Sequence, residues 1–445
     1  MIEDFPRFGW GLSAKSDPWD AADAATEQAL ARLGDGGVDF AFIVVCGRHG
    51  GHTAGVGDVV QRRAAPAHVI GCTASGCLAG AREVEDASAV SVMLARLPGV
   101  TLKPIMSRDW PARVDEQATD AEWLEAIGAG ASAPGPHRGT MILTDPSSLP
   151  VSKIFDRLAI AAGGASSPVG PVFGGVSSLG SDPGGNRLLL NGTLFDDGGV
   201  GLAWYGDIAI DSIVSQGCTP VGPTWLVTKS RGNVIFELGG RPAVERMREV
   251  VEGMGEERAA RIGRGLLLGR AVSEYKSRFG RGDFLIRRIF GADEEHGCIA
   301  LGDTIAAGKT VQFHVRERAT AEEDLALLLD GQKLHGTPAG ALVFSCIARG
   351  HRLFSNFGHD ARAIQRAFRS VEPGAERAKS GVARGDDIDP PVPLTGMFAA
   401  GEFGPIGSVP FVHGHTCSLA LFRKPEASDV ALDSDSALGS SDTGI

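Results

Sequence analysis

Four side chains that could do chemistry, a carboxylate, two imidazoles and a hydroxyl, lie within residues 396–416: Glu402, His413, His415 and Thr416. The apolar residues and glycines around them make the segment too apolar for a solvated loop and too interrupted for a helix. We expect a strand over residues 397–400, an irregular glycine-rich turn that carries Glu402 over residues 401–410, and a second strand over residues 411–421. Side chains alternate along a strand, so His413 and His415 would share one face.

A buried carboxylate needs a partner, which for Glu402 could be a histidine, an arginine or a ligand. Arg349 follows a mostly apolar segment at residues 339–346, which has the character of a strand buried on both faces and ends at Cys346. Its guanidinium could bind a carboxylate through two hydrogen bonds while Glu402 binds an ammonium group, and an amino acid carries both charges. The alternative is that Arg349 and Glu402 pair with each other.

Two further segments read as short strands that open onto glycines and small hydroxyls. Backbone can approach a ligand closely at glycine, and its N–H groups can then bind a carboxylate. We therefore expect these residues to line the same ligand site: Gly71, Cys72, Thr73, Ser75 and Gly76 in the first segment, and Gly174, Gly175 and Ser177 in the second. Cys346, His413, His415 and Thr416 are expected to line it as well.

Two other chemistries remain open. In a cysteine-dependent hydrolase or transferase, Cys346 or Cys72 would be the nucleophile and His413 or His415 the base. In a metal-binding protein, Glu402 and these two histidines would be ligands, with or without His49. The glycines around Cys72 and Ser75 do not have the offsets of a nucleophile elbow.

The elements that must position these residues give clear local signals. Asp17 followed by Pro18 predicts a helix start, and Gly34 predicts its end. The apolar run at residues 38–46 predicts a strand buried on both faces, and residues 88–97 predict another strand. Residues 151–162 have the pattern of an amphipathic helix. Residues 38–49 and 339–351 share a buried strand that ends in cysteine, followed by arginine and histidine, which hints at two related halves.

Composition excludes several classes of protein. The net charge of -11 and the interspersed basic residues argue against a nucleic-acid partner. The sequence shows no secretory leader and no apolar run of the roughly 18 residues that span a bilayer, so we expect a cytoplasmic protein without a membrane partner. Seven cysteines without a C-x-x-C pair fit neither a disulfide framework nor a zinc ribbon, and nothing indicates a cofactor.

The expected fold is mixed α/β in two domains, each with a mixed or mostly antiparallel sheet covered by helices, stacked in as many as four layers. The domain boundary is expected near residue 240, giving domains at residues 1–240 and 241–425. The acidic, serine-rich end at residues 426–445 is expected to be disordered.

Several phrases of the sequence resemble the FIST family (F-box and intracellular signal transduction proteins), with its N-terminal domain at residues 1–240 and its C-terminal domain at residues 241–425. The resemblance covers roughly residues 35–425, and it is carried by GCTASG at 71–76, FGGVSS at 173–178, QGCTPVGP at 216–223, VTKSRGNVIFELGGRPAVE at 227–245, LVFSCIARG at 342–350, GMFAAGEFGPIG at 396–407 and HGHT at 413–416.

The resemblance implies a sensory module for small ligands such as amino acids, which occurs alone or attached to signalling domains or an F-box. No F-box, kinase or receiver-like segment remains outside the matched span, so we expect a signalling partner that is a separate molecule. Cys218 stands where an aromatic residue often follows the glycine of the QG phrase, which affects the expected shape of the pocket rather than the fold.

Overall fold

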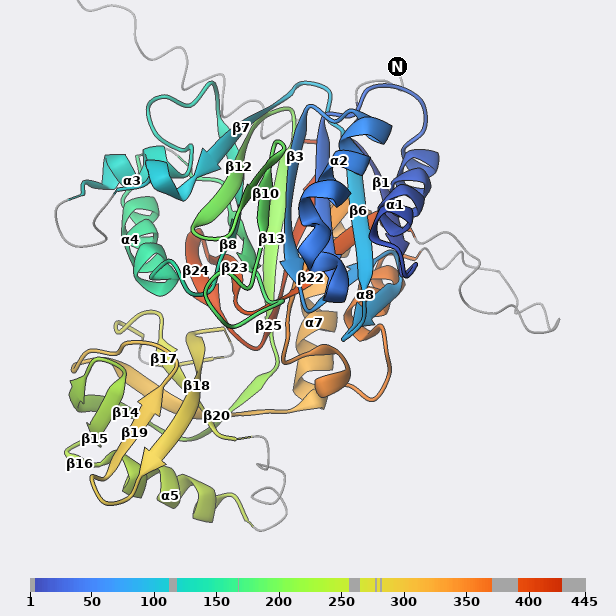
Figure 1. Cartoon of the computed structure of the whole chain (residues 1–445). Helices are drawn as coiled ribbons and strands as arrows, with labels where there is room; N and C mark the ends of the chain where they lie inside the picture. The colour runs from blue at the N-terminus through green and yellow to red at the C-terminus, as the bar shows by residue number, and fades with distance from the viewer. Residues whose placement is uncertain are drawn as a thin grey trace, which may run out of the picture. The chain divides into compact units, whose positions relative to one another are not determined.

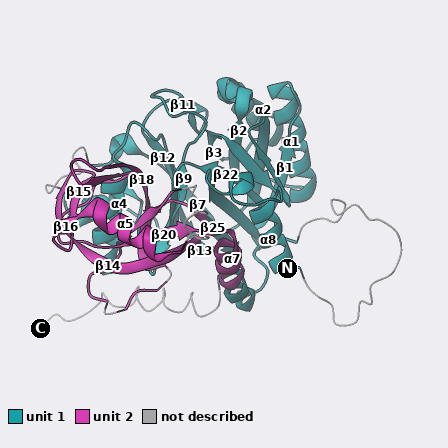
Figure 2. Ribbon diagram, turned by 90° about the horizontal axis from the view of Figure 1, so that it is seen from below, with its two compact units in different colours: residues 1–214, 329–411, 418–445 teal, residues 215–328, 412–417 magenta. Residues whose placement is uncertain are grey.

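The computed structural model describes residues 5–111, 118–166, 168–255, 265–276, 278–280, 282–369 and 391–425. The chain divides into two compact units (Figure 2): unit 1 is assigned residues 1–214, 329–411 and 418–445, and unit 2 residues 215–328 and 412–417. The expected tail at residues 426–445 lies outside the described residues. Among the described helices, none combines the length and apolar character needed to cross a membrane.

Unit 1 contains three six-stranded sheets. The first has the order β1 (Arg7–Ser13), β6 (Ala89–Arg96), β2 (Phe40–Cys46), β3 (His68–Ala74), β10 (Leu188–Leu190) and β11 (Thr193–Phe195). The second has the order β7 (Val100–Met106), β12 (Gly199–Gly206), β8 (His137–Thr144), β9 (Val172–Val176), β23 (Glu402–Ile406) and β24 (Val409–His413). The third, which lies mostly in unit 1, has the order β13 (Ala209–Gln216), β25 (Thr416–Arg423), β21 (Gly340–Cys346), β22 (Leu394–Ala399), β4 (Gly76–Ala79) and β5 (Arg82–Glu85).

The three sheets share one strand plan, which shows that unit 1 is built from three repeats. Each sheet has a parallel pair at its centre, β2–β3, β8–β9 or β21–β22. On one side lie the first and last strands of the same repeat. On the other side lie two successive strands that come from a different repeat: β10–β11 from the second repeat join the first sheet, β23–β24 from the third join the second, and β4–β5 from the first join the third. The two related segments suggested by the sequence contain β2 and β21, so the fold has three related parts and not two halves.

In each repeat one helix precedes the parallel pair in the chain, and a second helix connects the two strands of that pair. These are α1 (Pro18–Leu33) and α2 (Thr53–Ala64), α3 (Asp120–Ala126) and α4 (Val151–Gly163), and α7 (Arg318–Gln332) and α8 (His359–Ala367). The predicted helix start is confirmed, because the Asp17 side chain caps α1 by accepting hydrogen bonds from the N–H groups of Trp19 (3.0 Å) and Asp20 (2.9 Å). The predicted end is also confirmed, because Gly34 follows the helix with a φ of 79°.

The core of unit 1 explains the apolar character of its central strands. All seven residues of β2 are buried, as predicted, because α1 and α2 cover one face of the first sheet and the second and third sheets cover the other (Figure 1). Phe40 of β2 lies 5.1 Å from Trp204 of β12, between ring centroids. On the outer face of the second sheet, Phe155 of α4 lies 4.4 Å from Phe403 of β23. Helices thus cover the outer faces of the first and second sheets.

Unit 2 is an antiparallel barrel inserted into the third repeat between β13 and α7. Its strands follow the order β14 (Cys218–Arg231), β20 (Thr310–Arg316), β17 (Leu267–Ala271), β18 (Phe284–Asp293), β19 (Cys298–Leu301) and β15 (Val234–Leu238), and pairing between β14 and β15 closes the ring. The short β16 (Arg241–Pro242) leads into α5 (Ala243–Gly253), whose apolar side chains share a core with the barrel. The mixed α/β fold with mixed and antiparallel sheets is therefore confirmed.

Candidate functional site

The glycine-rich phrases follow equivalent strands of the three repeats. In the parallel pairs, Cys46 lies opposite Ala74, Thr144 opposite Val176, and Cys346 opposite Ala399. The segments that begin at Ser75, Ser177 and Ala400 therefore leave their sheets at matching positions. Sites in α/β proteins are commonly built at the carboxyl ends of parallel strands.

The structure brings these three strand ends together through small hydroxyl groups. The Oγ atom of Ser177 lies 3.3 Å from Oγ1 of Thr73 and donates a hydrogen bond to the carbonyl oxygen of Thr73. The backbone N–H of Ser75 donates to Oγ of Ser178 over 3.0 Å, and Oγ of Ser178 donates to the carbonyl oxygen of Phe398. Thr73 and Ser75 belong to the first repeat, Ser177 and Ser178 to the second, and Phe398 to the third. We call these five residues the hydroxyl junction.

Asn186 holds the hydroxyl junction in place, a role that the sequence reasoning missed. Its side chain is fully buried. The Oδ1 atom lies 3.1 Å from Oγ of Ser177 and accepts hydrogen bonds from the N–H groups of Leu179 (3.0 Å) and Gly180 (3.1 Å). The Nδ2 group donates to the carbonyl oxygen of Gly180 over 2.8 Å. One amide side chain thus shapes the whole loop after β9.

The glycines of the phrases allow strands to approach closely. A Cβ atom at Gly71 would overlap the carbonyl oxygen of Ile43, one at Gly174 would overlap that of Ile142, and one at Gly396 would overlap that of Val343. Each of these carbonyl groups lies on the partner strand of the parallel pair. Gly76 and Gly175 are similarly restricted, by Val84 and by Ala399 and Gly401 respectively. Close packing between strands accounts for glycine at these positions.

The two candidate nucleophiles are buried thiols. The Sγ atom of Cys72 lies 3.3 Å from Sδ of Met397, and burial raises the pKa of Cys72 well above its ordinary value. Since only the thiolate is an effective nucleophile, this environment does not activate Cys72. Cys346 is the last residue of β21 and is also buried.

Arg349 is fully buried and is held by Asp360, a residue that the sequence reasoning did not select. Its Nε atom donates a hydrogen bond of 2.8 Å to Oδ2 of Asp360, and its Nη2 atom donates one of 2.8 Å to Oδ1. Ser345 donates to the same carboxylate over 2.7 Å, and Nδ1 of His359 lies 3.0 Å from it. Burial alone would raise the pKa of Asp360, but Arg349 and His359 outweigh it and hold this pKa well below its usual range. The guanidinium is therefore fixed in one orientation.

Glu402 is the first residue of β23, so the expectation of an irregular turn at this position was wrong. It lies opposite Gly175 of β9 and is fully buried. Pairing with β9 keeps the segment extended, and the turn comes later, at Gly407, where φ is 65°.

The expected single strand over residues 411–421 is also wrong. In the structure β24 ends at His413 and β25 begins at Thr416, because His415 adopts a left-handed backbone conformation with a φ of 64°. The two imidazoles therefore do not share a strand face. His413, His415 and Thr416 are assigned to unit 2, where Nδ1 of His415 lies 3.5 Å from Nη1 of Arg316. Burial, followed by the charges of Arg316, Arg288 and Arg287, lowers the pKa of His415 to about 4.

A metal centre finds no support in the side chains that can be placed. Within the described residues, no three His, Cys, Asp or Glu side chains come together in a way that could hold a metal ion. His49 is buried, and its Nε2 atom lies 2.9 Å from the carbonyl oxygen of Lys15.

Glu83 of β5 adds an acidic group to the surroundings of Asp360. Its Oε1 atom accepts a hydrogen bond of 2.9 Å from the N–H of Ala361, while Oε2 is buried without a hydrogen-bond partner among the described residues. Burial, and next the charge of Asp360, raise the pKa of Glu83 from 4.5 to about 8. The folded protein therefore holds a neutral Glu83 at pH 7.

This raised pKa predicts a pH-dependent loss of stability. Between pH 4.5 and about 8 the unfolded chain has released the proton of Glu83 while the folded chain retains it. The contribution of Glu83 to the free energy of unfolding should therefore fall as the pH rises through this window, by up to about 1.4 kcal/mol per pH unit. Urea denaturation across the window should show that Glu83→Gln removes this slope, while Glu27→Gln on the exposed face of α1 retains it. Equal slopes in both variants would refute the assignment.

Comparisons with known proteins match two domain models to the chain. The model of the FIST N domain matches residues 39–241, and that of the FIST C domain matches residues 243–405. The two matches meet near residue 242, whereas the compact units divide the chain after residues 214 and 328. The inserted barrel thus includes the end of the first match and the start of the second.

The chain is similar in sequence to two mycobacterial proteins, and a solved structure of a further protein matches part of it. A protein of Mycobacterium tuberculosis described as uncharacterized is 35% identical over 424 residues, which cover 94% of this chain and 99% of the relative. One of Mycobacterium bovis, also uncharacterized, is 33% identical over 425 residues, covering 94% and 98%. A solved structure of cyanuric acid hydrolase matches 62% of this chain and 84% of its own at 11% identity, with a TM-score of 0.27 that does not establish a common fold. The two domain models together span most of the sequence, and the chain belongs to the FIST family.

Proposed function

We propose that the protein is a cytoplasmic sensor that binds a small ligand, an amino acid, and signals through a separate partner molecule. Membership of the FIST family supports a role in sensing and signal transduction. The observation that carries the proposal is the hydroxyl junction, where strand ends from three repeats meet in unit 1 through Thr73, Ser75, Ser177, Ser178 and Phe398.

The chemistry of unit 1 suits a zwitterion. The hydroxyl groups of Ser75 and Ser178 and the N–H groups of their loops can donate hydrogen bonds to a carboxylate. Arg349 adds further N–H donors on a guanidinium that Asp360 keeps in one orientation and whose charge Asp360 balances. Glu402 is a buried carboxylate, and a carboxylate can accept hydrogen bonds from the ammonium group of a ligand. In this proposal the ligand carboxylate lies at the hydroxyl junction and its ammonium group binds Glu402.

A ligand at the hydroxyl junction would act as a signal because it would replace contacts between repeats. The bonds from Ser75 to Ser178 and from Ser178 to Phe398 join three separate strand ends. A ligand that binds more tightly when these bonds are open shifts the population toward the open state. The separate partner would then distinguish the two states.

Isothermal titration calorimetry with a panel of amino acids tests the proposal. We expect one amino acid to bind more tightly than about 1 mM. Ser178→Ala and Glu402→Gln should each weaken that binding about tenfold or more, because each removes a hydrogen bond to a charged group. The matched controls Ser132→Ala and Glu27→Gln change exposed residues and should bind as the wild type does. Binding of no amino acid, or equal binding by all four variants, would refute the proposal.

A further inference from the structure

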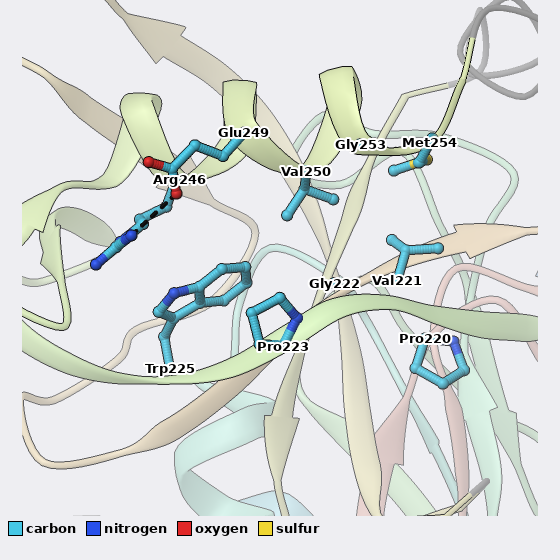
Figure 3. Close-up of a pocket in the computed structure, with 10 residues that line it drawn as sticks. All are labelled: Pro220, Val221, Gly222, Pro223, Trp225, Arg246, Glu249, Val250, Gly253 and Met254. Atoms are coloured by element: carbon cyan, nitrogen blue, oxygen red, sulfur yellow. Dashed lines mark hydrogen bonds and ion pairs between the residues drawn. The ribbon is translucent and has the colours of Figure 1, made fainter.

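Unit 2 has a pocket of its own, between β14 of the barrel and α5 (Figure 3). Its volume is about 470 Å³. Small-molecule sites in proteins span roughly 300 to 1,000 Å³, so the pocket has the capacity for a ligand of that class. It lies outside the hydroxyl junction, which belongs to unit 1.

A β-bulge lies in the wall of the pocket. The register between β14 and β20 shifts between Val221 and Thr224, so the irregular part of β14 includes Gly222 and Pro223, which line the pocket. Gly222 has a φ of 69°, and a Cβ atom there would lie 2.7 Å from Cγ2 of Val250. On α5, Gly253 has no side chain to fill the space. The QGCTPVGP phrase therefore makes one wall of a cavity.

The walls are mostly apolar and include one flat surface. Val221, Pro223, Val250 and Met254 line the pocket without offering a side-chain hydrogen bond. The indole ring of Trp225 forms the flat surface, and its edge-to-face contact with Phe313, at 5.5 Å between ring centroids, fixes its orientation. A planar apolar ligand could stack on this indole.

Two hydrogen-bond donors lie together at one end of the pocket. Arg246 donates from Nε to the carbonyl oxygen of Leu238 (3.3 Å) and from Nη1 to Glu249 (2.9 Å). For its Nη2 group and for the indole N–H of Trp225, the described residues supply no hydrogen-bond acceptor. A Cβ atom at Gly239 would lie 3.8 Å from Nη2 of Arg246 and 3.5 Å from Cδ1 of Trp225, so the two donors are close. Figure 3 shows them on the same side of the pocket.

The charges at this end balance, which decides between a neutral and an anionic ligand. Glu249 pairs with Arg241 (2.6 Å) and with Arg246 (2.9 Å), and Arg241 also pairs with Glu245 (2.9 Å). Two guanidinium groups thus meet two carboxylates, and no excess positive charge is left for an anion. A carboxylate on the ligand would also lie beside Glu249.

We propose that this pocket is a binding site for a flat, neutral, largely apolar molecule with one carbonyl-type hydrogen-bond acceptor. The ring stacks on Trp225, and the acceptor takes hydrogen bonds from the indole N–H of Trp225 and from Nη2 of Arg246. This is a second site, independent of the amino-acid site in unit 1. Its ligand differs from an amino acid in having no charge.

Nuclear magnetic resonance titration of the full chain with three simple probes tests this. The indole N–H resonance of Trp225 is identified by its loss in Trp225→Phe. We expect acetophenone to shift that resonance with a dissociation constant of about 1 mM, a typical affinity for a ligand of this size. Ethylbenzene has a similar shape without the acceptor, and benzoate carries a charge. Both should bind about tenfold more weakly, because a hydrogen bond is lost or an anion is placed beside Glu249.

Matched variants test whether the probes bind in this pocket. Arg246→Gln should weaken acetophenone binding about tenfold and leave ethylbenzene unchanged, while Arg248→Gln, on the same helix but outside the pocket, should change neither. The comparison of the three probes on the wild-type chain holds even if Arg246→Gln perturbs folding. The proposal is overturned if acetophenone does not bind, if ethylbenzene or benzoate binds equally well, or if Arg246→Gln has no more effect than Arg248→Gln.

Discussion

Replacing Asp360 with asparagine is expected to lower the free energy of unfolding by about 3 to 5 kcal/mol. Asp360 accepts two hydrogen bonds of 2.8 Å from Arg349, and both side chains are almost completely buried. The variant leaves the guanidinium charge buried without its carboxylate, and an uncompensated buried charge is costly. Urea denaturation at neutral pH measures the loss.

Glu83 should limit this loss as the pH rises. Asp360 is one cause of the raised pKa of Glu83, and the charge of Arg349 acts on the same group in the opposite direction. Once Asp360 is neutral, Glu83 can ionise more readily and supply part of the missing negative charge. We therefore expect Asp360→Asn combined with Glu83→Gln to be less stable than the sum of the two single changes predicts.

Two controls separate the buried ion pair from ordinary packing. Replacing both partners together, as Arg349→Met with Asp360→Leu, removes both charges and should be much less damaging than Asp360→Asn alone. Glu245→Gln breaks the exposed pair with Arg241 and should cost less than about 1 kcal/mol. An Asp360→Asn variant as stable as Glu245→Gln would contradict the assigned role.

Local signals in the sequence predicted individual elements well. Asp17, Pro18 and Gly34 determine the ends of α1 through capping and backbone conformation, which depend on neighbouring residues only. The apolar run of β2 also predicted its burial, because a strand that is covered on both faces carries apolar residues along its whole length. The three repeats could not be predicted, because the exchange of strands such as β4–β5 and β10–β11 depends on pairing between distant segments that share topology and little sequence.

The candidate site was predictable only in part. The glycine-rich phrases and Arg349 stand out by residue type, and the structure joins the phrases of the three repeats at the hydroxyl junction. Asp360 lies in the first turn of α8, but nothing in the sequence pairs it with Arg349. Asn186 makes its contacts through a loop conformation that residue type does not reveal. His415 was misread because a left-handed backbone is uncommon for residues other than glycine.

Replacing Gly174 with alanine is expected to cost about 4 kcal/mol of unfolding free energy and to disrupt the hydroxyl junction. Gly174 has a φ of 136°, which alanine adopts only with strain of about 1 to 3 kcal/mol. Its Cβ atom would also overlap the carbonyl oxygen of Ile142, on the neighbouring strand β8, and overpacking costs about 1 to 3 kcal/mol more.

A matched glycine separates these two costs. Gly192, between β10 and β11, has a φ of 80°, but a Cβ atom there would have no neighbouring atom within 4 Å, so Gly192→Ala should lose only about 1 to 2 kcal/mol from backbone strain. Equal losses in the two variants would show that β8 and β9 do not restrict Gly174.

Hydrogen exchange then connects stability with the site. In the wild type, the N–H of Ser177 donates to the carbonyl oxygen of Thr144 over 2.8 Å, and the N–H of Val176 donates to that of Gly401 over 2.8 Å. If alanine at position 174 forces β9 away from β8, both amides should exchange faster, while those of the α1 helix should change only with global stability. Faster exchange confined to the strand ends would mean that close packing at one glycine positions Ser177 and Ser178, and with them the proposed ligand site.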